Sequence, residues 1–207
     1  MIIALLPMLA WLAWEIFRPN PLLGAADSAV MAFRAGNEAT LMSYASPAEI
    51  VCSDLTAEKI RAAHRLLVAD LLEGSRLVSR TGGEMNTNAY QSSATERYIG
   101  PDGEPIQFSM VMNRTDDGPK AAVLIALLTQ RLSYGRDVKH RSKESSVQMA
   151  DDTAYWAPKL EAIGLKKVML NPGACITWAE LETIFRRSAA LEAENEVASK
   201  KAAKSRP

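Results

Sequence analysis

Cysteine and histidine are among the residues of this chain that could bind a metal ion or act as nucleophiles. They are Cys52, Cys175, His64 and His140, and neither histidine stands at zinc-ligand spacing from a cysteine. The cysteines could form one disulfide if the domain lies in an oxidising compartment, or they could be two small hydrophobic residues. We favour the second interpretation. His64 lies in an arginine-rich helical stretch and His140 in a basic loop, so we expect neither to be catalytic.

Paired carboxylates could serve in acid–base chemistry, but the acidic pairs of this chain suit turns and helix ends. The pairs are Asp102 with Glu104, Asp116 with Asp117, and Asp151 with Asp152. The first two lie in predicted hairpin turns, and the third begins a predicted helix, whose N-terminus favours negative charge. Gly82-Gly83 lacks the Lys-Ser/Thr pair and the helix start of a phosphate-binding loop. We therefore predict no catalytic residue, no metal site and no cofactor.

The overall composition limits the possible partners. The chain has 207 residues, of which 48% are hydrophobic and 23% charged, with 24 basic and 24 acidic side chains. This length suits one domain with appendages. The even charge balance argues against a general nucleic-acid binder, which needs a basic excess to contact phosphates.

The first seventeen residues, MIIALLPMLAWLAWEIF, contain one charged side chain, Glu15. As a helix this segment would be about 25 Å long, close to the lower limit for crossing a bilayer. We predict a membrane-anchor helix within residues 1–21, and hence a single-pass membrane protein. The residues expected to contact lipid are Leu5, Leu6, Leu9, Trp11, Leu12, Trp14 and Phe17.

Two alternatives compete with the anchor. A cleaved secretory signal would begin with a basic region, but no Lys or Arg precedes the apolar run. The other alternative is a helix packed against partner subunits. For an anchored chain, Arg18 and Arg34 follow the span, which slightly favours the cytoplasmic side for the domain.

Helical periodicity appears at three places in the next part of the chain. Apolar residues over 27–42 recur with helical spacing, with an interruption at Gly36. Residues 46–49, Ser-Pro-Ala-Glu, have the form of a capping box, with proline at the first helical position. Residues 56–73 begin with a threonine that can cap a helix and carry a single apolar face.

Alternating periodicity follows and predicts an antiparallel meander. Residues 106–112 alternate between apolar and polar, with turn signals on both sides. Residues 88–99 and 120–132 are the expected neighbouring strands, and 76–80 is a strand at the edge. Residues 121–128 are almost all apolar and could be a helix, but the preceding turn favours a strand.

The order of helices followed by a meander resembles the NTF2-like (cystatin-like) α+β superfamily. The resemblance is carried by Phe33-Arg34-Ala35-Gly36-Asn37, Leu41, Ser46-Pro47-Ala48-Glu49 and the meander. It implies an α+β domain over residues 22–134, in which a curved antiparallel sheet wraps around the helices. Family members use the interior as an active or ligand site, or the outer sheet face to bind proteins, and membrane-anchored members are commonly assembly components.

Some residues of the predicted sheet are candidates for a partner-facing surface or a pocket lining. They are Tyr90, Tyr98, Phe108 and Met110. An open pocket would hold a buried ionisable residue such as Glu96 or His64 and would suit an enzyme or a small-ligand binder. An interior filled by Tyr98, Phe108 and Met110 would contradict that pocket.

Residues 135–207 are predicted to form a helical extension. A helix over 151–165 is expected to be broken or delayed by Pro158, and 166–170 is expected to be a short strand. A second capping box, Thr-Trp-Ala-Glu, should open a helix at residue 177 that frays beyond Glu192 into a charged tail. A basic cluster before these helices is either a solvated loop or a contact for lipid or an anionic partner: Arg136, Lys139, Arg141 and Lys143.

The sequence thus favours a non-catalytic accessory or assembly subunit of a larger membrane protein complex, for example a photosynthetic or respiratory one. Its partners would be other subunits and the lipid bilayer. The alternative is a membrane-tethered enzyme or small-ligand-binding domain that uses an NTF2-like pocket. These hypotheses differ in whether the interior of the sheet is open.

Overall fold

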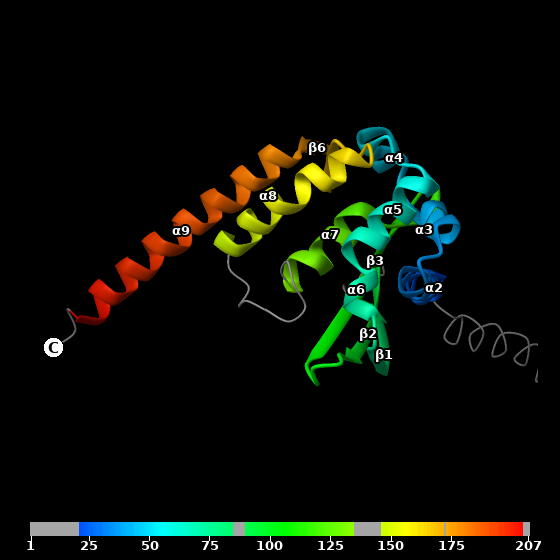
Figure 1. The fold of residues 1–207 in the computed structure, drawn as a ribbon, viewed down its shortest axis with the longest axis horizontal. Helices are drawn as coiled ribbons and strands as arrows, with labels where there is room; N and C mark the ends of the chain where they lie inside the picture. The colour runs from blue at the N-terminus through cyan, green and yellow to red at the C-terminus, as the bar shows by residue number, and fades with distance from the viewer. Residues whose placement is uncertain (1–20, 85–89, 135–145, 172, 205–207) are drawn as a thin grey trace, which may run out of the picture.

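The computed structural model describes residues 21–84, 90–134, 146–171 and 173–204. They form an α+β protein with an antiparallel sheet, which confirms the predicted class. Figure 1 shows helices beside the sheet and long helices toward the C-terminus that extend from this body. The predicted anchor residues and the basic cluster lie outside the described ranges. Within those ranges, no helix is long and apolar enough to cross a membrane.

Short helices make up the first part of the body. They are α2 (Pro21–Ala35), α3 (Glu38–Tyr44), α4 (Pro47–Ser53), α5 (Ala57–Leu67) and α6 (Ala69–Leu72). Gly36, at φ 62°, ends α2 as predicted. The side chains of Ser46 and Thr56 accept hydrogen bonds from backbone N–H groups and cap α4 and α5. The helix predicted over 56–73 is divided at Val68, and α2 begins before the predicted residue 27.

The sheet has the strand order β1-β2-β3-β4, and its neighbours are antiparallel. Its strands are β1 (Arg76–Glu84), β2 (Gln91–Ile99), β3 (Pro105–Thr115) and β4 (Gly118–Lys120). Alternate residues of β3 face inward, as the sequence pattern predicts. Helix α2 packs across β2 and β3, where the rings of Phe33 and Phe108 lie 5.4 Å apart.

The prediction of a long strand over 120–132 is wrong. Strand β4 ends at Lys120, and the chain then forms helix α7 (Val123–Tyr134). Residues 121–128 are apolar at nearly every position, so the pattern fits a buried helix as well as a strand. In the structure, the buried residues of α7 recur at helical spacing. The hydroxyl of Tyr134 accepts a hydrogen bond of 2.5 Å from the Gln107 N–H, so α7 covers part of the β3 edge.

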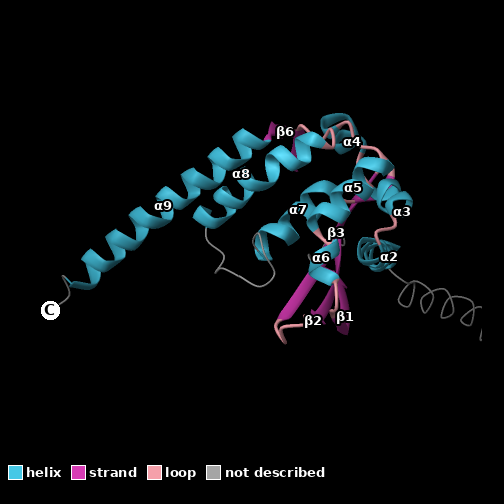
Figure 2. Ribbon diagram, viewed as in Figure 1, coloured by secondary structure: helices cyan, strands magenta, loops and turns pink. Residues whose placement is uncertain are grey.

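The last part of the described chain contains α8 (Ser146–Ala162), β5 (Lys167–Asn171), β6 (Ala174–Thr177) and α9 (Trp178–Lys204). The expected break at Pro158 is wrong, because Trp156 and Leu160 pack into the core on both sides of the proline and hold α8 together. The expected fraying beyond Glu192 is also wrong, since the backbone of α9 stays helical to Lys204. Figure 2 shows α8 and α9 side by side, and we call this pair the arm.

One core joins these parts. Side chains from the helices and from the inner face of the sheet form its centre, and Trp156, Leu160, Trp178 and Leu181 extend it to the start of the arm. The predicted extension therefore shares its hydrophobic core with the α+β domain. Burial of apolar area of this kind is the main favourable term in folding.

Candidate functional site: the arm and its disulfide-bonded base

The interior of the sheet is packed with side chains. Tyr98, Phe108 and Met110 are all buried, and the Tyr98 and Phe108 rings meet edge to face at 5.7 Å. Tyr90 is 58% exposed and precedes β2 at the other end from Tyr98, so the four predicted residues do not form one surface. Tyr98, Phe108 and Met110 fill the interior, and this packing contradicts the alternative of an open pocket lined by them.

Glu96 is buried in the interior and is engaged on both oxygens. Its Oε1 accepts a 2.9 Å hydrogen bond from Nε of Arg80, and Nη1 of Arg34 lies 3.6 Å away. The hydroxyl of Tyr98 donates to Oε2. Burial, together with the Glu96 carboxylate, raises the pKa of Tyr98 above its ordinary value. The cluster therefore compensates a buried charge with positive and hydrogen-bonding partners.

His64, the other candidate ionisable residue, links two helices. Its Nε2 lies 2.7 Å from the carbonyl oxygen of Phe33, to which it donates a hydrogen bond near the end of α2. The ring is close to Gly36, where an added Cβ would lie 3.0 Å from Nδ1. Burial lowers the pKa of His64, which favours the neutral ring. These contacts give His64 a structural role.

Glu49 caps a helix other than its own. Its carboxylate accepts hydrogen bonds from the N–H groups of Val123 (2.9 Å) and Leu124 (2.7 Å), at the positive end of α7. Burial raises the pKa of Glu49 to about 7, although the backbone N–H donors of α7 act in the opposite direction. The sequence predicted the local half of this arrangement, in which Ser46 accepts from the Glu49 N–H at 3.1 Å.

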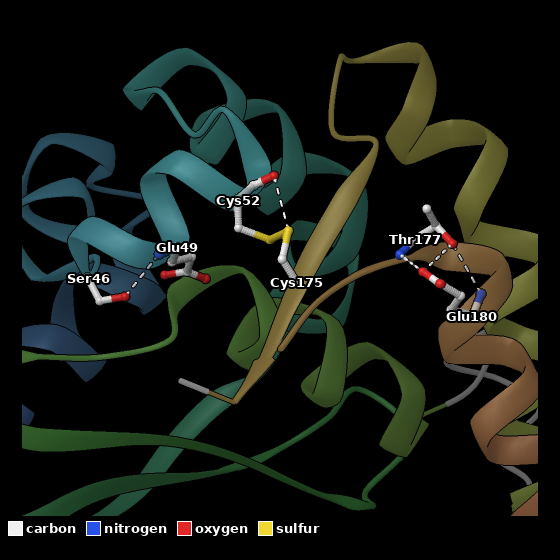
Figure 3. Close-up of a disulfide and its surroundings, with 6 residues drawn as sticks. All are labelled: Ser46, Glu49, Cys52, Cys175, Thr177 and Glu180. Atoms are coloured by element: carbon white, nitrogen blue, oxygen red, sulfur yellow. Dashed lines mark hydrogen bonds between the residues drawn. A yellow bond between two sulfur atoms is a disulfide. The ribbon is translucent and has the colours of Figure 1, made fainter. Parts of the chain in front are cut away.

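A disulfide closes the base of the arm, which we define as the β5–β6 hairpin. Cys52 in α4 bonds to Cys175 in β6, with their Cα atoms 5.6 Å apart (Figure 3). The favoured interpretation of two separate thiols is therefore wrong. No local signal marks the pair, because 123 positions separate its members in sequence. The fold brings them together by packing α4 against β5 and β6.

The start of α9 is fixed at this base by the predicted capping box. Thr177 N–H donates to Oε2 of Glu180 at 2.7 Å, and Glu180 N–H donates to Oγ1 of Thr177 at 3.3 Å (Figure 3). Nε1 of the buried Trp178 donates to the carbonyl oxygen of Leu165 at 2.7 Å. The first turn of α9 is thus held both by its own cap and by the chain that leaves α8.

A buried arginine connects the body to α8. Arg131 of α7 bonds both carboxylate oxygens of Asp70 at 2.8 Å, and its guanidinium carbon lies 4.6 Å from the ring centroid of Trp156. Both Asp70 contacts are made by Nη1, and the stacking on Trp156 suits the planar guanidinium of arginine better than a lysine ammonium. Sequence reasoning missed Arg131 because it lies inside an apolar stretch.

The distal part of the arm has polar contacts along its seam and apolar residues beside it. Oγ of Ser146 lies 2.6 Å from a carboxylate oxygen of Glu192 and 3.1 Å from Oγ of Ser188. Ile184 and Leu191 are 41% and 59% exposed. Figure 1 shows that this part of the arm extends away from the body, at the opposite end of the long axis from α2. Ile184 and Leu191 are seven positions apart, which places them on the same face of α9.

Known proteins offer no family for this chain: no protein-family model, curated protein or solved structure matches it. Among the described residues, no group of three or more His, Cys, Asp or Glu side chains could hold a metal ion. Contacts within the chain are therefore the basis for a functional assignment.

Proposed function

We propose that this chain is a non-catalytic accessory or assembly subunit of a larger membrane protein complex. Photosynthetic and respiratory complexes are examples of such assemblies. A membrane-anchor helix within residues 1–21 would attach it to the bilayer as a single-pass protein, and the arm would contact other subunits. The proposal includes no cofactor and no nucleic acid.

For residues 22–134 we propose an NTF2-like arrangement. Two observations support it: α2 to α6 precede the β1–β4 meander, and α2 lies across β2 and β3. The departure is α7, which replaces most of the expected last strand and covers part of the β3 edge. This difference shortens the sheet but keeps the order of helices before strands.

The observation that carries the functional proposal is the arm. Helix α9 packs against α8 and β6 and continues past Ser146, the first residue of α8, which lies beside Glu192. Helices in proteins are stabilised mostly by tertiary packing, and α9 extends beyond the first residue of α8, the helix it packs against. A partner subunit that packs on the distal arm would supply the missing contacts and cover Ile184 and Leu191.

The interior of the domain supports a binding role over a catalytic one. Among the described residues, the buried carboxylates and histidine that could serve as acids or bases are Glu49, His64, Glu96 and Asp152, and each has partners within the fold. A general acid or base must reach a substrate at hydrogen-bond distance. Buried and engaged in this way, these groups contribute to stability and positioning.

The proposal is tested by isolating the full chain from its native membranes in mild detergent and measuring the particle mass. We expect a particle much heavier than the monomer. The paired substitution Ile184→Glu with Leu191→Glu should release the monomer, because it places charges on the proposed contact surface. The matched control is Val78→Glu, at a residue of β1 that is 53% exposed, and it should leave the particle intact.

A wild-type chain that elutes as a stable monomer without other subunits would contradict the proposal. If the Val78→Glu control loses the particle as strongly as the arm variant does, the arm is not the contact surface for other subunits. The folded state of each variant is checked by its thermal unfolding transition, since exposed substitutions change stability by about 0.5 kcal/mol or less.

A further inference from the structure

The Cys52–Cys175 bond lies where a partner can reach it. Cys175 is exposed and Cys52 is half-buried. The two residues line an open hollow of about 630 Å³ together with Pro47, Ala48, Val51 and Lys167. The hollow is mostly apolar, and Val51 beside it is 83% exposed.

The chemistry of this hollow favours thiol–disulfide exchange at Cys175. Exchange proceeds by attack of a thiolate on a disulfide sulfur, so its rate depends on how accessible the reacting sulfur is. Lys167 pairs with Thr177 across the β5–β6 hairpin, two residues beyond Cys175, and lines the same hollow. Cys175 is the exposed member of the pair, and so it is the one that a second protein would engage first.

We propose that this pair is an exchange site for an oxidised dithiol protein, and that the domain lies on the oxidising side of the membrane. The Cys175 thiolate attacks the disulfide of the partner and forms a mixed disulfide, while the S–S bond of the partner breaks. The Cys52 thiolate then attacks the Cys175 sulfur and releases the partner as a dithiol. Two electrons and the two thiol protons pass from the cysteines to the partner.

We infer the oxidising side of the membrane because the Cys52–Cys175 disulfide must persist there. Structural disulfides are retained in oxidising compartments and are rare where glutathione and thioredoxin keep thiols reduced. This assignment is opposite to the side that Arg18 and Arg34 slightly favour. Arg34 lies at the end of α2, and its guanidinium is 3.6 Å from the buried Glu96 carboxylate, so its charge is used within the fold.

The redox state is measured first, in native cells that are quenched with acid and alkylated with a polyethylene-glycol maleimide. The wild-type chain should shift on a gel only after reduction, by two adducts. Sidedness is measured in the Cys52→Ser variant, which leaves the exposed Cys175 as a single thiol. A membrane-impermeant maleimide added outside the intact bilayer should label it, and the Cys52→Ser/Cys175→Ser variant should remain unlabelled.

Two outcomes overturn the inference. One is a wild-type chain whose cysteines are alkylated without reduction, and the other is a Cys175 thiol that reacts only after the bilayer is disrupted. The inference rests on the proposed function only for attachment to a membrane. An exported chain that carries the disulfide but elutes as a soluble monomer would retain the redox assignment and contradict the membrane-subunit proposal.

Discussion

The body and the arm of this protein are stabilised by different means. The body has a closed interior in which buried side chains of distant elements satisfy each other, as Glu49 does for α7 and His64 for α2. The arm has one packed seam between α8 and α9, and its base depends on a disulfide and a capping box. Under the proposed function, the body provides stability and the arm is the part that would contact another subunit.

Removing a side chain from the body should have the largest effect. Phe108→Ala is expected to lower the free energy of unfolding by about 3–5 kcal/mol, because it leaves a cavity between α2 and the sheet. Val111→Ala, on the exposed side of the same strand, should cost about 0.5 kcal/mol. Urea denaturation measures both values. Equal losses would show that the interior is not closely packed.

Reduction of the disulfide should have the next largest effect. The bond spans 123 positions, and loops of this size are stabilised by about 3–5 kcal/mol when crosslinked. Hydrogen exchange should increase most in β5, β6 and the start of α9, and less in β2 and β3, where it should increase only through the loss of global stability. The Cys52→Ser/Cys175→Ser variant should not respond to reductant. Equal acceleration in all strands would contradict a local role at the base.

The pH dependence of stability should show the effect of Glu49. Its pKa is 4.5 in the unfolded chain and about 7 in the folded one, so the folded state binds the extra proton between these values. Stability from this site is therefore present below pH 4.5 and is lost as pH rises through 7, by about 3 kcal/mol at most. His64 acts in the opposite direction, because its lowered pKa costs stability as pH falls.

The control for Glu49 is Glu49→Gln, which keeps one carbonyl oxygen for the α7 N–H groups and cannot ionise. The free energies of unfolding of the two proteins are compared between pH 5 and pH 8. The wild type should lose stability relative to the variant as pH rises. A wild type that gains stability relative to the variant would mean that the N–H donors of α7 outweigh burial.

Substitution on the arm should have the smallest effect on folding. Leu191→Ala is expected to change the free energy of unfolding by about 0.5 kcal/mol or less, because this side chain is already exposed. Thermal denaturation of the isolated chain measures it. A loss above about 2 kcal/mol would place Leu191 in the fold and remove it from the contact surface.

The elements with local signals were predictable from the sequence. The capping boxes at residues 46–49 and 177–180 and the alternation over 106–112 depend on neighbouring residues, and the structure has a helix or strand at each. The contacts made over long distances in sequence were not predictable. The partner of Cys52 and the helix that Glu49 caps are set by packing, and an apolar run such as 121–128 suits either a strand or a buried helix.

The most direct test of the account places a photo-crosslinking amino acid in the full chain in its native membranes, at Leu191 of the arm or at Val78 of the sheet edge. Both side chains are exposed to a similar extent, at 59% and 53%. The account predicts a discrete adduct with another subunit from Leu191 and none from Val78. Adducts from Val78 alone, or from neither position, would contradict an arm that binds the complex.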